Sequence, residues 1–114
     1  MIYAVFDTNV ILQGILSVTG PAGACIQLVS DRRCQLITAE KVISEIESVV
    51  SRPKLIAKYE QLRGERPDLF LKKIRGQATI AAYPPRIYDF QRDPTDEIFI
   101  NLALANNADY LCQP

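Results

Sequence analysis

At 114 residues the chain is long enough for one compact domain and too short for two. Hydrophobic residues make up 48% and charged residues 23%, a globular balance that excludes a disordered chain. Lys and Arg number 13, as do Asp and Glu, so the net charge by itself points neither to nucleic acid nor to a membrane.

Basic residues gather in the middle of the chain. Between residues 52 and 75, eight cations stand against three acids, which are Glu60, Glu65 and Asp68. The cations are Arg52, Lys54, Lys58, Arg63, Arg66, Lys72, Lys73 and Arg75. Such a distribution suits a polyanion held beside a cation-binding pocket, and a solvated helix face explains any single member equally well.

The cysteine and histidine contents limit which catalytic groups and metal ligands the chain can supply. Cys25, Cys34 and Cys112 are odd in number and fit no zinc spacing, which indicates reduced thiols in a cytoplasmic protein. Histidine is absent, so any catalysis must depend on carboxylates. No stretch approaches about 18 apolar residues, so we expect neither a membrane span nor a signal peptide.

The first half of the chain alternates strand and helix patterns. Residues 2–6 are apolar, β-branched and aromatic, which predicts a buried parallel-type strand ending at Asp7. Asp7, Thr8 and Asn9 are suited to cap the segment after this strand. A helix is predicted from about 21 to 30, and a second strand over 34–38.

Thr38 is the predicted N-cap of a helix that runs to about residue 51. One apolar stripe would face the core, formed by Val42, Ile43, Ile46, Val49 and Val50. Pro53 ends this helix and suits the first turn of the next.

The second half is less regular. Residues 53–82 predict one or two helices, interrupted around 64–67, and a weak strand follows at 86–90. A helix opens at 93–96 and stops at Asn106 and Asn107, before a final strand over 108–111. Strands that alternate with helices predict an α/β fold, with a parallel sheet covered on both faces and functional groups at the carboxyl ends of its strands.

Asp7 and Glu45 are candidate site residues, and each has a structural alternative. Asp7 ends an apolar strand, where a cap or turn residue is equally expected. Glu45 falls about 100° from the centre of the apolar stripe, at the boundary between core and solvent. A surface Glu on a helix is commonplace.

A third acidic position lies in the stretch Asp93-Pro94-Thr95-Asp96-Glu97. An N-cap Asp93, with Pro94 at the first helical position and acids placed against the helix dipole, explains the stretch structurally. One Asp meets that demand, and the stretch supplies a surplus. Carboxylates converging from separate elements suit Mg²⁺ or Mn²⁺, whose bound water attacks a phosphodiester at neutral pH.

Four stretches resemble PIN domains, in particular the bacterial group related to VapC toxins. Residues 5–10 resemble the opening strand with its first acid, and residues 37–54 resemble the helix that carries the family's Glu. Residues 93–99 resemble the segment of the third acid, best matched by Asp96, and residues 108–111 resemble the strand that leads to a fourth.

The resemblance implies a three-layer α/β/α PIN-like (Rossmann-like) fold over residues 1–114, as a single domain. It also implies a Mg²⁺- or Mn²⁺-dependent ribonuclease that acts as the toxin of a toxin–antitoxin pair. Asp7, Glu45 and Asp96 would be catalytic and metal-binding residues, Asp93 a further metal ligand, and Thr8 or Asn9 a brace for Asp7. The implied partners are RNA, a protein antitoxin, and further copies of the chain in a homodimer or higher homo-oligomer.

The chain departs from the family pattern after the Tyr110–Leu111 strand. The family continues into a turn with another Asp and closing elements, whereas Cys112-Gln113-Pro114 follows here. We therefore expect the domain to lack its last elements and its fourth acid, with weaker cation binding and activity. The alternative function is an impaired PIN-fold module that only binds RNA or a protein partner.

Overall fold

The computed structural model describes residues 1–82 and 94–113, without the side chains of residues 94–97. Its four-stranded sheet contains β1 (Ile2–Phe6), β2 (Cys34–Ala39), β3 (Thr79–Ala81) and β4 (Tyr110–Cys112). The strand order is β3-β2-β1-β4, and every pairing is parallel. β1 is therefore an inner strand, which explains why Ala4, Val5 and Phe6 are all buried.

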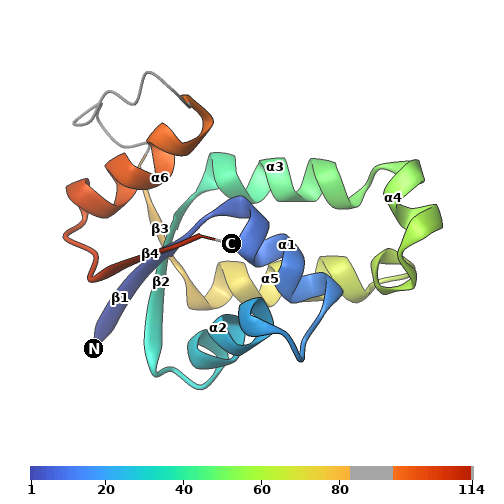
Figure 1. Ribbon diagram of the computed structural model, residues 1–114, viewed down its shortest axis with the longest axis horizontal. Helices are drawn as coiled ribbons and strands as arrows, with labels where there is room; N and C mark the ends of the chain where they lie inside the picture. The colour runs from blue at the N-terminus through green and yellow to red at the C-terminus, as the bar shows by residue number, and fades with distance from the viewer. Residues whose placement is uncertain (83–93, 114) are drawn as a thin grey trace.

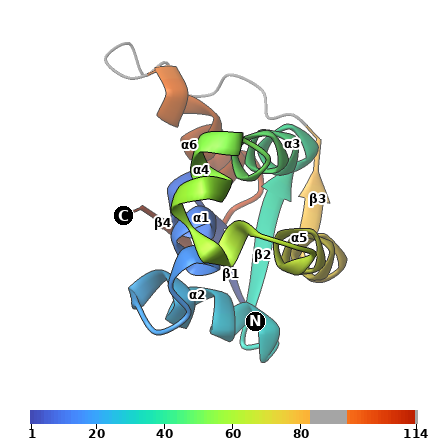
Figure 2. The same cartoon turned by 90° about the vertical axis from the view of Figure 1, so that its right-hand side faces the viewer.

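The helices in chain order are α1 (Thr8–Leu16), α2 (Pro21–Ser30), α3 (Glu40–Val50), α4 (Pro53–Lys58), the short 3₁₀ helix η1 (Glu60–Leu62), α5 (Arg66–Gln77) and α6 (Pro94–Ala105). They make three layers with the sheet. In Figure 1 α6 lies on one side of the strands, while α1 and α5 lie on the other. Figure 2, turned by 90°, shows α1 to the left of β2 and α5 to its right, with α3 and α6 above. The predicted parallel sheet and α/β/α layering are thus confirmed.

Residues 52–65, which we name the arm, join α3 to α5 and comprise α4, η1 and the turn after it. Figure 1 shows the arm at the far end of the molecule from the sheet. Arg63 fixes its shape, because its Nε donates to Ile56 O at 3.1 Å and its Nη2 to Ala57 O at 2.8 Å. Gln61 Nε2 donates to Leu16 O at 2.9 Å and so ties η1 to the end of α1.

Several predicted elements are confirmed. β1 and α2 occupy the predicted ranges, and Pro53 begins α4. The predicted stripe of α3 is buried at Val42, Ile43, Ile46 and Val50, and half-buried at Val49. α6 ends at Ala105, and Asn107 then adopts φ 51°, a left-handed conformation that Asn tolerates after a helix.

Two predictions are wrong. Thr38 does not cap α3: β2 continues to Ala39 because Thr38 and Ala39 pair with Ile80 and Ala81 of β3, and Ala39 becomes the N-cap without a side-chain hydrogen bond. Residues 79–81, expected within a helical stretch, form β3 instead. The strand expected at 86–90 lies outside the described residues.

Gly23 allows the start of α2 to pack closely against the turn that follows α1. A Cβ at this position would lie 2.2 Å from Val18 O, and a backbone atom cannot move aside to relieve such a clash.

Together, α1 and α2 form a pair, bent by 96°, that is long and apolar enough to span a membrane. No single helix among the described residues is long and apolar enough to do so. Buried residues of both helices, including Ile11 and Ile26, belong to the hydrophobic core.

Candidate functional site

Asp7 lies at the carboxyl end of β1, next to the end of β4. Its side chain is 7% exposed, and its backbone N–H donates to Cys112 O at 3.0 Å. From β1 the chain proceeds to β2 and β3 on one side and returns to β4 on the other. The strand order therefore reverses between β1 and β4, and Asp7 stands at that switch point, where α/β sheets place their ligands.

The Asp7 carboxylate has two separate environments. Oδ1 accepts a hydrogen bond from Asn9 N at 2.9 Å and caps α1, so the predicted capping role is confirmed. Among the described residues no donor contacts Oδ2. One side chain can therefore both cap a helix and offer an oxygen to a cation, and the two interpretations do not exclude each other. Thr8, half-buried, begins α1, and Asn9 is exposed.

Glu45 lies in the second turn of α3 and is exposed. α3 carries two other acids, Glu40 and Glu47, and both pair with Arg75 from α5. Arg75 Nη2 lies 3.0 Å from Glu47 Oε1, and these hydrogen bonds, chiefly the one to Glu40, raise the pKa of the Arg75 guanidinium. Glu45 has no hydrogen bond or ion pair with any other described residue, which leaves its carboxylate available.

Asp96 lies in the first turn of α6, which packs against β1, β2 and β4. Its side chain, like all of Asp93, lies outside the described residues. Within the described side chains, no three acids, cysteines or histidines gather as metal ligands. The roles of Asp7, Glu45, Asp96 and Asp93 at a metal remain predictions.

Asp109 belongs to the opposite end of the sheet. Its Oδ2 accepts from Tyr3 N at 2.8 Å, and its own N–H donates to Tyr3 O at 2.7 Å. This reciprocal pair joins the amino end of β4 to β1. Asp109 is therefore a structural residue, away from the edge where Asp7 lies.

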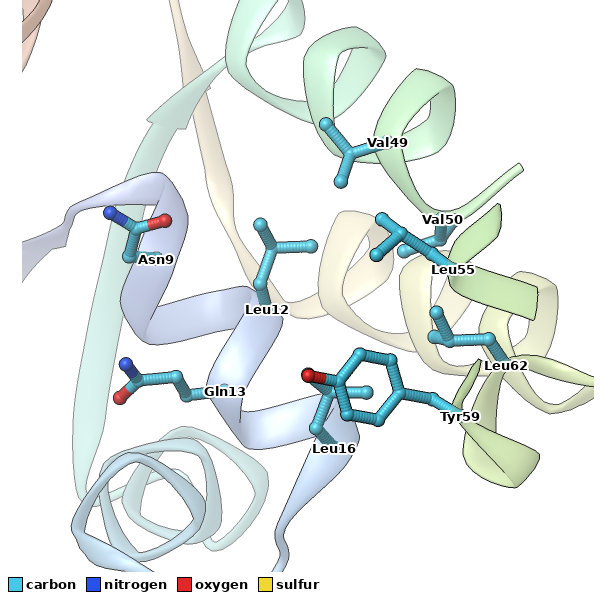
Figure 3. A pocket seen from close by; sticks show the side chains of 9 residues that line it. All are labelled: Asn9, Leu12, Gln13, Leu16, Val49, Val50, Leu55, Tyr59 and Leu62. Carbon is cyan, nitrogen blue, oxygen red and sulfur yellow. The ribbon is translucent and has the colours of Figure 1, made fainter. Parts of the chain in front are cut away.

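A groove that the sequence did not reveal begins beside Asp7. Asn9, Leu12, Gln13 and Leu16 of α1 form one wall, and Leu55 and Tyr59 of the arm stand opposite, together with the end of α3 (Figure 3). We name it the α1 groove; its volume is about 220 Å³. The i, i+4 spacing of Leu12 and Leu16 was its only local signal, and that spacing equally describes a core-facing helix.

The three cysteines meet around a second cavity, of about 390 Å³, on the sheet side of α2. Burial raises the pKa of the Cys34 and Cys112 thiols, with a smaller contribution from the neighbouring Cys25. All three thiols are free, as predicted.

A family model described as PIN domain matches residues 3–112, nearly the whole chain. No curated protein and no solved structure matches the chain significantly. PIN domains are in general nucleases that act on RNA and typically use divalent metal ions.

Proposed function

Because the chain belongs to the PIN domain family, we propose that it is a metal-dependent endoribonuclease that cleaves RNA phosphodiester bonds. The observation that carries this proposal is the position of Asp7. Asp7 is 7% exposed, Asn9 N donates to one oxygen of its carboxylate, and no described residue donates to the other oxygen. A cation at the switch point supplies the remaining partner.

In this proposal Asp7, Glu45 and Asp96 hold Mg²⁺ or Mn²⁺, with Asp93 as a further acid. The donor set fits, because these hard cations prefer carboxylate and water oxygens. A bound ion lowers the pKa of a water and offsets phosphate charge. Asn9 holds the Asp7 carboxylate in place through its backbone N–H, and Thr8 begins the helix that presents both residues.

We further propose that the chain is the toxin of a VapC-like toxin–antitoxin pair and acts in the cytoplasm as a homodimer or higher homo-oligomer. The resemblance of residues 5–10, 37–54 and 93–99 to VapC-related PIN domains supports the toxin assignment, and the three free thiols suit a reducing compartment. An antitoxin that inserts an Arg among these carboxylates would block the site by charge-assisted hydrogen bonds.

The decisive experiment incubates the full chain with single-stranded and structured RNA in Mn²⁺, Mg²⁺ or EDTA. An Asp7→Asn/Asp96→Asn variant is the matched control. We expect cleavage that requires the metal and disappears in the variant. If a folded sample cleaves nothing yet still binds RNA, the proposal fails and the binding-module alternative takes its place.

A further inference from the structure

Two of the three thiols around the cysteine cavity are direct neighbours. The cavity, of about 390 Å³, is lined by Cys25 from α2, Cys34 from β2 and Cys112 from β4. A hydrogen bond joins the thiols of Cys25 and Cys112. Both of these residues are half-buried, whereas Cys34 is only 8% exposed. Cys25 and Cys112 therefore form a thiol pair that a small solute can reach.

The sheet separates Cys34 from Cys112, because β1 lies between β2 and β4. Cys34 pairs with Ile2 at the amino end of β1. Cys112 pairs with Phe6 at the carboxyl end. Neighbouring strands are about 4.8 Å apart, so the Cα atoms of Cys34 and Cys112 are at least about 9 Å apart, and a disulfide requires Cα atoms within about 7 Å. The sheet therefore excludes a Cys34–Cys112 bond, and the hydrogen bond favours Cys112 as the partner of Cys25.

A bond between Cys25 and Cys112 would fasten the end of a weakly supported strand. β4 has three residues and, among the described strands, only β1 as a neighbour. Its last residue, Cys112, accepts the Asp7 N–H at 3.0 Å. A covalent link to α2 would hold this strand end from a second side and would close a loop that contains most of the chain. Closing a long loop stabilises a fold by restricting the unfolded chain.

The cysteine cavity also carries a positive charge. Arg33 is exposed and lines the cavity beside the thiols, and its guanidinium forms no hydrogen bond or ion pair with another described residue. The adjacent Arg32 lines a different cavity. Glutathione disulfide, the small disulfide of the cellular thiol pool, carries carboxylates that an arginine can bind. The charge of Arg33 therefore favours an anionic disulfide as the reactant of the thiol pair.

We propose that Cys25 and Cys112 form a disulfide by exchange with glutathione disulfide, a reversible modification that is independent of the proposed nuclease activity. Burial raises the pKa of the Cys112 thiol and lowers its thiolate fraction, which assigns the first attack to Cys25. The Cys25 thiolate attacks one sulfur of glutathione disulfide, giving a mixed disulfide and one glutathione thiolate. Cys112 then loses its proton and attacks Cys25 Sγ, and the second glutathione leaves as a thiolate. The protons of the two cysteines end on the two glutathiones, so two protein thiols are oxidised and one glutathione disulfide is reduced.

The test incubates the full chain in mixtures of reduced and oxidised glutathione and maps its disulfides by mass spectrometry after alkylation and tryptic digestion. Trypsin cleaves after Lys and Arg, so the three cysteines fall in separate peptides, residues 1–32, 34–41 and 93–114. We expect a crosslink between the first and the last peptide, in a chain that runs as a monomer on a non-reducing denaturing gel. The melting temperature of the oxidised protein rises by about 10 °C, and dithiothreitol reverses the rise.

Two pairs of variants serve as matched controls. Cys34→Ala keeps the crosslink and the rise in melting temperature, whereas Cys112→Ala loses both. Arg33→Gln slows oxidation by glutathione disulfide at least about threefold and leaves oxidation by the uncharged hydroxyethyl disulfide unchanged. Arg32→Gln behaves as the wild type with both reagents.

The inference is overturned by a crosslink between residues 1–32 and 34–41, by a disulfide that joins two chains, or by the absence of any crosslink in fully oxidised glutathione. If the crosslink joins Cys25 to Cys112 but Arg33→Gln and Arg32→Gln react equally fast, the thiol pair stands and the preference for an anionic disulfide is rejected.

Discussion

Asp7 combines two requirements in one side chain. Its Oδ1 caps α1 through Asn9 N, and the carboxylate as a whole stands where β1 and β4 end. Asn caps a helix as well as Asp does. Binding a cation, in contrast, requires the negative charge of the Asp7 carboxylate. A substitution that keeps the shape and removes the charge therefore separates the two.

We predict that Asp7→Asn folds with a stability within about 0.5 kcal/mol of the wild type and loses its response to metal. In the wild type, Mn²⁺ raises the melting temperature because a ligand of the folded state stabilises it. Scanning fluorimetry with Mn²⁺ and with EDTA checks this. An equal shift in both proteins would remove Asp7 from the metal site.

Glu45 and Glu47 form a natural pair for a second test, because they are two residues apart on α3 and only Glu47 is paired with Arg75. We predict that Glu45→Gln lowers RNA cleavage at least about 10-fold with unchanged stability. Glu47→Gln should cost at most about 1 kcal/mol of stability and leave cleavage unchanged. Rates and melting curves of the two variants, measured side by side, check both halves. The reverse pattern would place the catalytic acid of α3 at Glu47.

At the scale of elements, the packing of α1 against α2 depends on small residues. A Cβ at Gly23 would meet Val18 O at 2.2 Å, and one at Gly14 would meet Ile26 Cγ1 at 2.7 Å. Only the second neighbour is a side chain that can move. The contact at Gly14 lies between the two helices, whereas the stricter backbone contact at Gly23 limits how closely α2 approaches the turn after α1.

We predict that Gly23→Ala lowers the free energy of unfolding by about 1–3 kcal/mol, since the start of α2 must move away from Ser17 and Val18 in the turn before it. Gly76→Ala is the control. Nothing lies within 4 Å of a Cβ at Gly76, which is in α5, so the alanine stabilises the helix by about 0.5–1 kcal/mol. Urea denaturation of both variants decides; a neutral Gly23→Ala would mean that the α1–α2 contact adapts freely.

The sequence predicted best those elements that carry their own signal, such as a continuous apolar run or a proline at the start of a helix. β1 has a continuous apolar run, and α2 begins at Pro21, so both ranges were predictable. β3 was missed because its three residues, two of them exposed, carry no periodicity, and only pairing with β2 makes them a strand. The same applies to the site. Asp7 and Glu45 were named from the sequence, but the pairing of Glu47 with Arg75 and the α1 groove come from elements that meet only in the folded chain.

At the scale of the whole molecule, the three free cysteines come from α2, β2 and the end of β4 and line one shared cavity. Burial raises the pKa of Cys34 and Cys112 above the ordinary value of 9.0. The unfolded chain therefore releases these protons at lower pH than the folded chain does. The resulting stabilisation is complete below about pH 9 and is lost as the pH rises through the folded pKa values.

We predict that, above about pH 9, the melting temperature of the wild type falls more steeply with pH than that of Cys34→Ala/Cys112→Ala. Both proteins share every other titrating group, so the difference in slope isolates the thiols. Parallel slopes would show that the two thiols titrate alike in the folded and unfolded chains.

The reciprocal pair between Tyr3 and Asp109 spans 106 positions of the chain. At the carboxyl end of β1, the Asp7 N–H donates to Cys112 O of β4. This side of β1 therefore has no neighbouring strand until β4 has been made. A ribosome releases the amino terminus first, and such distant pairings form late in folding. The β1–β4 edge, where Asp7 lies, is therefore completed only after residues 110–112 have been made, and the surroundings of Asp7 are among the last parts of the described fold to form.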